Sequence, residues 1–245
     1  MKLVELEARL AKLLQPELHA DCCPNGLQVG REGREVNRLA LAVSATLEVI
    51  QQAIAWGADA LLTHHGLFWQ GASPCLTGPL QSRVKALLGA DLALLSYHLP
   101  LDRHPLLGNN AQLGLQLGLG QGQAWGPANA GLRFQLQLTP QELVKRISDL
   151  LGQAPRHLDF GPTEIRQMVI VTGGGQNYVA TAFAEGADCF VTGLLDEPNY
   201  AAAQEAKAHL FGLGHHASEQ FGVRALGQWL GNDLECKFIQ TRNPL

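Results

Sequence analysis

The sequence predicts an α/β fold, because short apolar strands alternate with helices and because one such stretch recurs later in the chain. Residues 38–97 are expected to form strand, helix, strand, helix and strand, an order typical of parallel pairing in one sheet. Gly186-Ala187-Asp188 lies 129 positions after Gly57-Ala58-Asp59, and an apolar run follows each copy. We therefore expect two related α/β domains that arose by an internal duplication.

The first half of the chain carries clear signals for each element. Leucines at helical spacing predict a helix over residues 3–15, and a short strand is expected at 27–30, between glycines. Gly57 and Gly89 are placed to end the two following helices. The elements expected next are strands at 38–44, 58–63 and 92–97 and helices at 45–56, 80–88 and 109–118.

In the second half, residues 119–131 are rich in Gly and Gln and are expected to form the domain boundary. Thr139, Pro140 and Glu142 predict the start of a helix that runs to about residue 151. Strands are expected at 132–138, 168–171, 189–192, 209–213 and 235–240, and helices at 177–184, 198–208 and 217–230. The expected domains are 1–125 with 210–245, which would bind metal, and 126–209.

Composition narrows the class of protein. The 245 residues are 46% hydrophobic, enough for a substantial core. Net charge is -4 and no basic run occurs, so a nucleic-acid groove is not expected. An odd number of cysteines without a CxxC pair indicates reduced thiols of a cytoplasmic protein. Acidic residues near the N-terminus do not fit a signal peptide, and no apolar run approaches the roughly 20 residues that span a bilayer.

Histidines and carboxylates follow three of the predicted strands. His64 and His65 end one strand, Asp102 follows another, and His215 and Glu219 follow a third. In open α/β sheets, ligands bind beyond the carboxyl ends of the strands. The candidate metal ligands are therefore His64, His65, Asp102, His215 and Glu219.

Imidazole and carboxylate ligands without thiolate suit zinc, iron, manganese, cobalt or nickel. Five ligands exceed what one catalytic ion takes, and they suit two ions about 3.5–4 Å apart that share a metal-bound hydroxide. His98 and His216 are candidates for general acid/base catalysis, with an outer-shell role as the alternative for both and plain exposure as a further one for His216. Asp196 is expected to cap the helix near residue 198.

Four motifs in order resemble those of the NIF-three-like family, also called GTP cyclohydrolase 1 type 2 homologues or dinuclear-metal-centre proteins. They are residues 25–30 (NGLQVG), 63–65 (THH), 97–102 (YHLPLD) and 214–219 (GHHASE). The likeness runs nearly end to end, and residues 97–113 resemble the compact bacterial branch. One departure is Gly66, where the family usually has Pro after the His pair.

The resemblance implies two interlocked α/β domains assembled as a toroidal homohexamer. It also implies a two-metal centre that faces the inner cavity, with the same five ligands, Glu219 as the bridging carboxylate and His98 as a further site residue. The activity it implies is that of a metal-dependent hydrolase acting on GTP or another purine-like compound. A non-enzymatic, ring-shaped metal-binding scaffold or sensor is the alternative, and an oxidoreductase would require redox-active iron or manganese.

Overall fold

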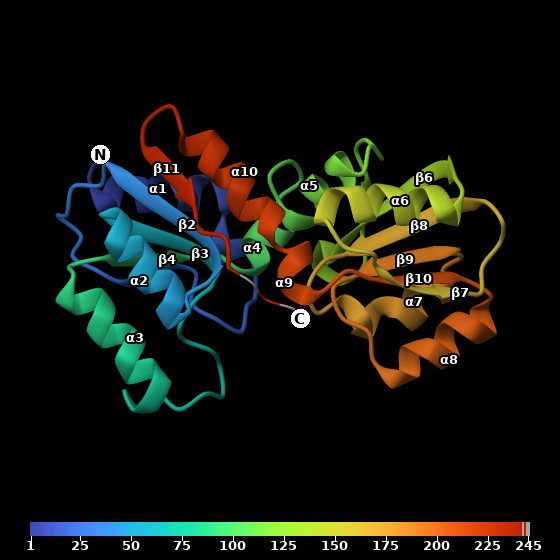
Figure 1. Cartoon of the computed structure of the whole chain (residues 1–245), viewed down its shortest axis with the longest axis horizontal. Coiled ribbons are helices and arrows are strands. Elements are labelled where there is room, and N and C mark those ends of the chain that lie inside the picture. Colours follow the sequence, from blue (N-terminus) through green and yellow to red (C-terminus); the bar gives the residue numbers. More distant parts are fainter. Residues whose placement is uncertain (242, 244–245) are drawn as a thin grey trace. The chain divides into compact units, whose positions relative to one another are not determined.

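The computed structural model describes residues 1–241 and 243. The chain divides into two units, each with its own sheet and helices (Figure 1). The first unit contains Met1–Leu101 and the stretch that starts at Gly222, and the second contains Asp102–Phe221. None of the helices in the described part of the chain is long and apolar enough to cross a membrane.

The sheet of the first unit has five strands in the order β1-β4-β3-β2-β11. Its strands are β1 (Gly26–Val29), β2 (Arg38–Ser44), β3 (Ala60–His65), β4 (Ala93–Ser96) and β11 (Glu235–Phe238). Only β1 runs antiparallel to its neighbour, β4, while the other pairings are parallel. The helices are α1 (Leu3–Leu14), α2 (Leu47–Trp56), α3 (Gly78–Gly89), and parts of α4 (Leu99–Asp102) and α10 (Gln220–Leu230).

The central strands of this unit are apolar because helices cover both faces of the sheet. Ile50 of α2 and Leu87 of α3 pack in one core with Leu61 of β3, and α1 and α10 lie on the opposite side of the sheet (Figure 1). Thr46 caps α2 by accepting a hydrogen bond from the Val49 N–H at 3.2 Å. Thr is one of the residue types that commonly cap the start of a helix in this way.

The sheet of the second unit has six strands in the order β5-β6-β8-β9-β10-β7. Its strands are β5 (Gln123–Trp125), β6 (Gly131–Leu138), β7 (Arg156–Asp159), β8 (Ile165–Val171), β9 (Cys189–Thr192) and β10 (His209–Gly212). The three strands β8, β9 and β10 are parallel, and the flanking strands are antiparallel. The helices are α5 (Asn109–Gln116), α6 (Pro140–Leu151), α7 (Val179–Ala184), α8 (Glu197–Ala206) and α9 (His215–Ser218).

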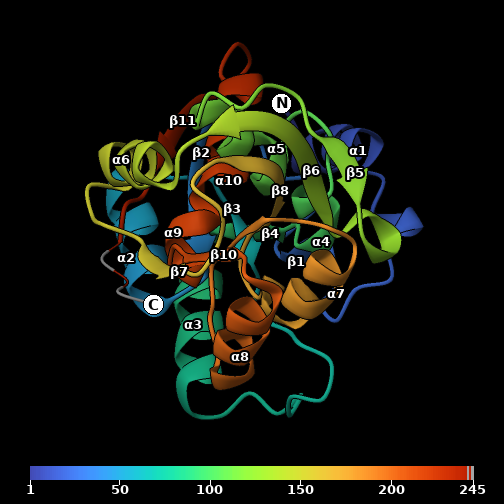
Figure 2. The same ribbon diagram turned by 90° about the vertical axis from the view of Figure 1, so that its right-hand side faces the viewer.

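Two cores fill the two faces of this second sheet. On one face, Leu113 of α5 and Ile147 of α6 pack with Phe211. On the other face, Val179 of α7 and Ala203 of α8 pack with neighbouring side chains of β8, β9 and β10. Figure 2 views the sheet with α6 on one side and α7 and α8 on the other.

The boundaries between the two units lie at residues 101/102 and 221/222. The boundaries expected from the sequence were 125/126 and 209/210. Residues 119–131 contain β5 and the start of β6, which pair with each other in the second sheet. β10 is paired with β9 in the same sheet. The glycines in 119–131 serve turns instead of a boundary, since Gly120 and Gly126 have φ of +76° and +78°.

Three local expectations differ from the structure. Neither β5 nor β7 was expected, because both are short and partly polar. Pro100 argues against a regular helix at residues 99–102, yet these residues form one helical turn, and the first turn of a helix tolerates proline. The strand before the His pair was expected to end at Thr63, but β3 continues through His65, paired with Ser44.

Both units share one order of elements. In the first unit α1, β1, β2, α2, β3, α3 and β4 follow one another, and in the second α6, β7, β8, α7, β9, α8 and β10. The turns also agree. The Asp59 carboxylate accepts hydrogen bonds from the N–H groups of residues 37 and 38 at 2.9 and 3.0 Å. Asp188 accepts them from residues 166 and 167 at 2.9 and 3.0 Å.

Candidate metal centre

The His pair forms the carboxyl end of β3, and each ring contacts a different neighbouring segment of the chain. His64 is fully buried, and its Nδ1 lies 3.1 Å from the carbonyl oxygen of Tyr97. Because a carbonyl can only accept, Nδ1 carries the proton and Nε2 presents its lone pair. The Nδ1 of His65 lies 3.0 Å from the hydroxyl of Ser44 on β2.

A third imidazole, His98, joins this pair. Its ring centroid lies 5.1 Å from that of His64 and 5.7 Å from that of His65. Ligand atoms of the three rings lie within 4.8 Å of one another. The indole of Trp69 stands edge-on to His98 at 5.2 Å between centroids. The first unit therefore brings together three imidazole rings whose nitrogen atoms can act as metal ligands.

Asp21 fixes the orientation of His98. Its Oδ1 lies 2.7 Å from the His98 Nδ1, and the Leu99 N–H donates to its other oxygen at 2.9 Å. The Asn25 amide also donates to Asp21, at 3.0 Å. This carboxylate directs the proton of His98 to Nδ1, which leaves Nε2 as the basic nitrogen.

These contacts also set the charge of Asp21, whose side chain is only 3% exposed. Burial alone would raise the pKa of this carboxyl. The hydrogen bonds from His98 and Asn25 outweigh that effect, and together they hold the pKa of Asp21 well below its usual range. Asp21 is therefore ionised near pH 7.

Gly66 gives the chain space for a side chain from β1. A Cβ atom at this position would lie 2.2 Å from the Gln28 Nε2 and 2.4 Å from its Oε1. The Gln28 amide donates to the Pro24 carbonyl at 2.8 Å and accepts from the Leu67 N–H at 2.8 Å. Gln28 therefore fixes the turn that follows the His pair.

In the second unit, His215 and Glu219 form a second set of donors. Helix α9 begins at His215, so the two side chains, four positions apart, lie on one face. The His215 Nε2 lies 3.1 Å from the Glu219 Oε2, with the side chains 33% and 3% exposed. An imidazole and a buried carboxylate therefore share one position at the carboxyl end of β10.

Gly173 provides the seat for Glu219. A Cβ atom there would lie 1.8 Å from the Glu219 Oε1, and the residue has φ of +62°. The Gly173 N–H donates to the Ser218 hydroxyl at 2.9 Å, and the Thr172 N–H donates to the Asn110 Oδ1 at 2.8 Å. The N–H groups of Thr172 and Gly173 are therefore both bonded within the protein and are not available to bind an anion. The structural role of Gly173 is to leave space for Glu219.

Asp102, the last residue of α4, belongs to the same unit as His215 and Glu219. Its Oδ1 accepts a hydrogen bond from the Asn109 amide at 2.8 Å. This contact orients the carboxylate, as outer-shell groups do for metal ligands. Asn109 itself is fully buried.

His216 lies next to His215 and is 8% exposed. Neither of its ring nitrogens has a hydrogen-bond partner among the described residues. Burial lowers the pKa of His216, the charge of Glu219 opposes this, and His215 adds to it. The ring is therefore neutral near pH 7, but His216 belongs to none of the clusters of potential ligands in the described part of the chain, whereas His98 does.

Sequence reasoning missed the part that Asp21 plays in the site. Asp21 accepts a local hydrogen bond from the Cys22 N–H at 2.7 Å, but its partner His98 lies 77 positions away. No local spacing signals such a pair. Asp196 behaves as expected, since it caps α8 through the Asn199 N–H at 3.3 Å.

The chain is similar in sequence to known proteins over its whole length. The sequence profile of Duf34/NIF3 (NGG1p interacting factor 3) matches residues 1–244. The chain belongs to the Duf34/NIF3 family. A relative from Vibrio cholerae, named GTP cyclohydrolase 1 type 2 homolog, is 41% identical over 254 residues and covers all of both chains. A relative of the same name from Escherichia coli K12 is 39% identical, again over both full chains.

Solved structures show that this Duf34/NIF3 chain has the family's fold. The structure of TTHA1606 from Thermus thermophilus superposes with a TM-score of 0.92 at 30% identity, and each chain is covered completely. A structure described as protein ybgI, of unknown function, gives 0.94 at 37% identity over both full chains. The family resemblance and the mixed α/β class are thereby confirmed.

Proposed function

We propose that this Duf34/NIF3 protein binds two divalent metal ions and is a hydrolase of the GTP cyclohydrolase 1 type 2 kind. The observation that carries the proposal is the pair of donor sets at the carboxyl ends of strands. One set is the cluster of His64, His65 and His98, and the other is the contact between His215 and Glu219. The names of the bacterial relatives support the activity.

In this proposal, the ligands that would hold the metal ions are His64, His65, Asp102, His215 and Glu219. The residues suit such ions, because the Nδ1 of His64 is bonded to a carbonyl and Gly173 leaves room for the buried carboxylate of Glu219. When bound, two such ions would acidify a water molecule for attack on substrate. Zinc, iron, manganese, cobalt and nickel all accept this set of ligands.

His98 is the residue we propose to transfer protons. Asp21 fixes its Nδ1 proton, so Nε2 takes up a proton from the attacking water or returns one to the leaving group. His216, buried and neutral, is the second candidate for this role. Trp69, edge-on to His98, forms one wall against which a flat purine-like ring can pack.

A cavity of about 360 Å³ in the second unit supports a small-molecule substrate. Gly193, Leu194, Gly214 and Arg156 are among the residues that line it. Gly214 directly precedes His215, so the cavity adjoins the second donor set. The guanidinium of Arg156 suits a phosphate of a nucleotide such as GTP.

Two further features belong to this proposal. The shared order of elements and the matching turns at Asp59 and Asp188 support an internal duplication. We also propose that the two units are interlocked and that the chain assembles as a toroidal homohexamer whose cavity the metals face. Mass measurement in solution tests the assembly directly.

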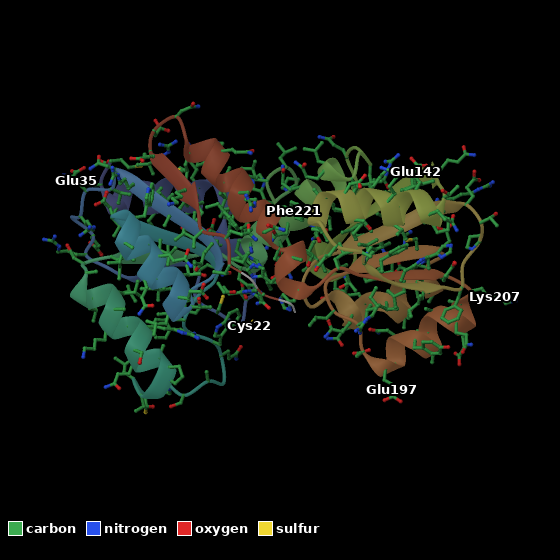
Figure 3. The ribbon with its side chains drawn as sticks, in the orientation of Figure 1. Cys22, Glu35, Glu142, Glu197, Lys207 and Phe221 are labelled. Carbon is green, nitrogen blue, oxygen red and sulfur yellow. The ribbon has the colours of Figure 1, made fainter. Side chains whose placement is uncertain are left out.

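The test of the function is metal content together with turnover. Protein purified without added metal is expected to hold at least two ions per chain and to consume GTP or another purine compound from a substrate panel. Glu219→Gln is expected to lose metal and turnover together, whereas Glu197→Gln, an exposed change in α8 labelled in Figure 3, is expected to lose neither. Turnover that survives complete loss of metal would contradict the mechanism. Absence of turnover with any substrate, combined with a large drop in Tm on chelation, would favour the scaffold or sensor instead.

A further inference from the structure

A second group of histidine and carboxylate side chains lies elsewhere in the second unit. His157 and Asp159 are two positions apart on β7, so they share one face of the sheet. On the adjacent strand β10, His209 pairs with Asp159 and Phe211 pairs with His157. Potential ligand atoms of His157, Asp159 and His209 lie within 4.8 Å of one another.

This cluster is separate from the candidate metal centre. His209 begins β10, whereas His215 follows the end of that strand. β10 alone spans three residue steps of about 3.3 Å each. Lys207, labelled in Figure 3, marks the turn between α8 and β10 that leads into His209. The cluster thus lies at the end of the sheet opposite to His215 and Glu219.

We propose that His157, Asp159 and His209 form an independent binding site for a divalent transition metal ion such as zinc. The distances match a tetrahedral ion. The His157 Nε2 and His209 Nδ1 lie 3.3 Å apart, and the His209 Nδ1 and Asp159 Oδ1 lie 3.2 Å apart. Zinc–nitrogen bonds of about 2.0–2.1 Å place two ligand atoms of a tetrahedron about 3.3 Å apart.

The surroundings of His209 orient it as a ligand. Its Nε2 lies 2.7 Å from the carbonyl oxygen of Pro162, so Nε2 carries the proton and the Nδ1 lone pair faces the cluster. Metal-binding histidines commonly donate their other N–H to a carbonyl in this way. Gly161 leaves room for the ring, since a Cβ atom there would lie 2.4 Å from the His209 Cδ2.

His157 is held in place as well. Its ring stacks on Phe211 with centroids 4.1 Å apart and planes within 8°. Burial lowers the pKa of His157, Asp159 opposes this and His209 adds to it, so the imidazole is neutral near pH 7 and able to bind metal. The side chain of Asp159 is 60% exposed and that of His209 only 1%. The site is therefore open to water on one side, and a bound ion would link edge strand β7 to β10.

The competing interpretation is a simple hydrogen bond from His157 Nε2 to His209 Nδ1 that needs no metal. The metal site and the hydrogen bond predict different numbers of bound zinc ions per chain. We expect the wild-type chain, stripped by chelation and dialysed against zinc, to bind one zinc ion per chain more than His157→Gln. The matched control His19→Gln should bind as many ions as wild type.

Because outer-shell changes already weaken metal sites about 10- to 100-fold, loss of a ligand in His157→Gln should weaken this site by more than about 100-fold. A second measurement separates zinc binding at this cluster from zinc binding at the candidate metal centre. In the Glu219→Ala chain, zinc should still shift the ring-nitrogen NMR signals of His157 and His209. Equal zinc content of wild type and His157→Gln, or histidine signals that zinc leaves unchanged, would overturn the proposal.

Discussion

The Nδ1 atom of His98 lies 2.7 Å from the Oδ1 atom of Asp21, and both side chains are largely buried. The N–H groups of Cys22 and Leu99 and the amide of Asn25 also donate to Asp21, so the pair is the centre of a small polar network. Its two members come from segments that the sequence separates by 77 positions. Because of this network, the position of the proton on the His98 ring can be tested without knowing the substrate.

Asp21→Asn should disturb both the proton position and the stability of the first unit. The two carboxylate oxygens accept from Cys22, Asn25, His98 and Leu99, and an amide would turn an NH₂ group toward one pair of these donors. Nitrogen NMR of the His98 ring should report a smaller share of the Nδ1–H tautomer. The free energy of unfolding should fall by about 1–3 kcal/mol. Asp233→Asn, which removes an exposed ion pair with Arg9, should cost less than about 1 kcal/mol.

The free energy of unfolding should also depend on pH because of the Asp21 carboxyl. The folded-state pKa of this carboxyl is well below its usual range because hydrogen bonds from His98 and Asn25 outweigh burial, whereas the unfolded value is about 3.9. The stabilisation is therefore complete above the unfolded pKa and is lost as the pH falls from about 4 toward the folded pKa. Denaturant unfolding of wild type and Asp21→Asn at pH 7, 5 and 3 should give curves whose difference shrinks at pH 3. A difference that stays constant would rule out this carboxylate as the source.

Gly173→Ala should release Glu219 from its seat. The new Cβ would lie 1.8 Å from the Glu219 Oε1, so the carboxylate must move. The backbone strain of an alanine with φ of +62° is matched by Gly152→Ala, where φ is +70° and no atom lies within 4 Å. Both variants should lose about 1 kcal/mol from the backbone. Only Gly173→Ala should also lose bound metal, as measured by elemental analysis; equal metal contents would refute the assigned seat.

Gly66→Ala should cost stability because its Cβ occupies the place of the Gln28 amide. Gln28 would have to give up its bonds to Pro24 and Leu67, and we expect a loss of about 1–2 kcal/mol. The same substitution should cost less in a Gln28→Ala chain, which a double-mutant cycle measures. Gly33→Ala, with no atom within 4 Å, should change stability by less than about 0.5 kcal/mol. Additive effects of the two changes would contradict the contact.

Local signals in the sequence predicted most of the fold. The strand at residues 38–44 has the expected bounds, and Thr139 caps α6 through Glu142 as expected, because such features depend on neighbours along the chain. β7 was missed because its residues Arg156–Asp159 are polar and partly exposed. An edge strand of this kind forms only when a neighbour pairs with it, which no local pattern reveals.

The candidate site was predicted unevenly for the same reason. His64 and His65 were predicted as ligands because they end an apolar run, and His215 and Glu219 because they follow a predicted strand. Asp21, Gly173 and Gln28 position these residues, but each is distant in sequence from the group that it holds. Their parts depend on the tertiary fold and stay hidden until the strands are paired.

The late position of β11 has a consequence for biosynthesis. Glu235 pairs with Arg38, 197 positions earlier, so the first sheet lacks an outer strand until residues 235–238 have left the ribosome. Every strand of the second sheet is made by residue 212. We therefore expect the inserted unit to fold first during translation, while β2 waits with one edge open to other chains. Crowded expression at high temperature would favour aggregation through that open edge.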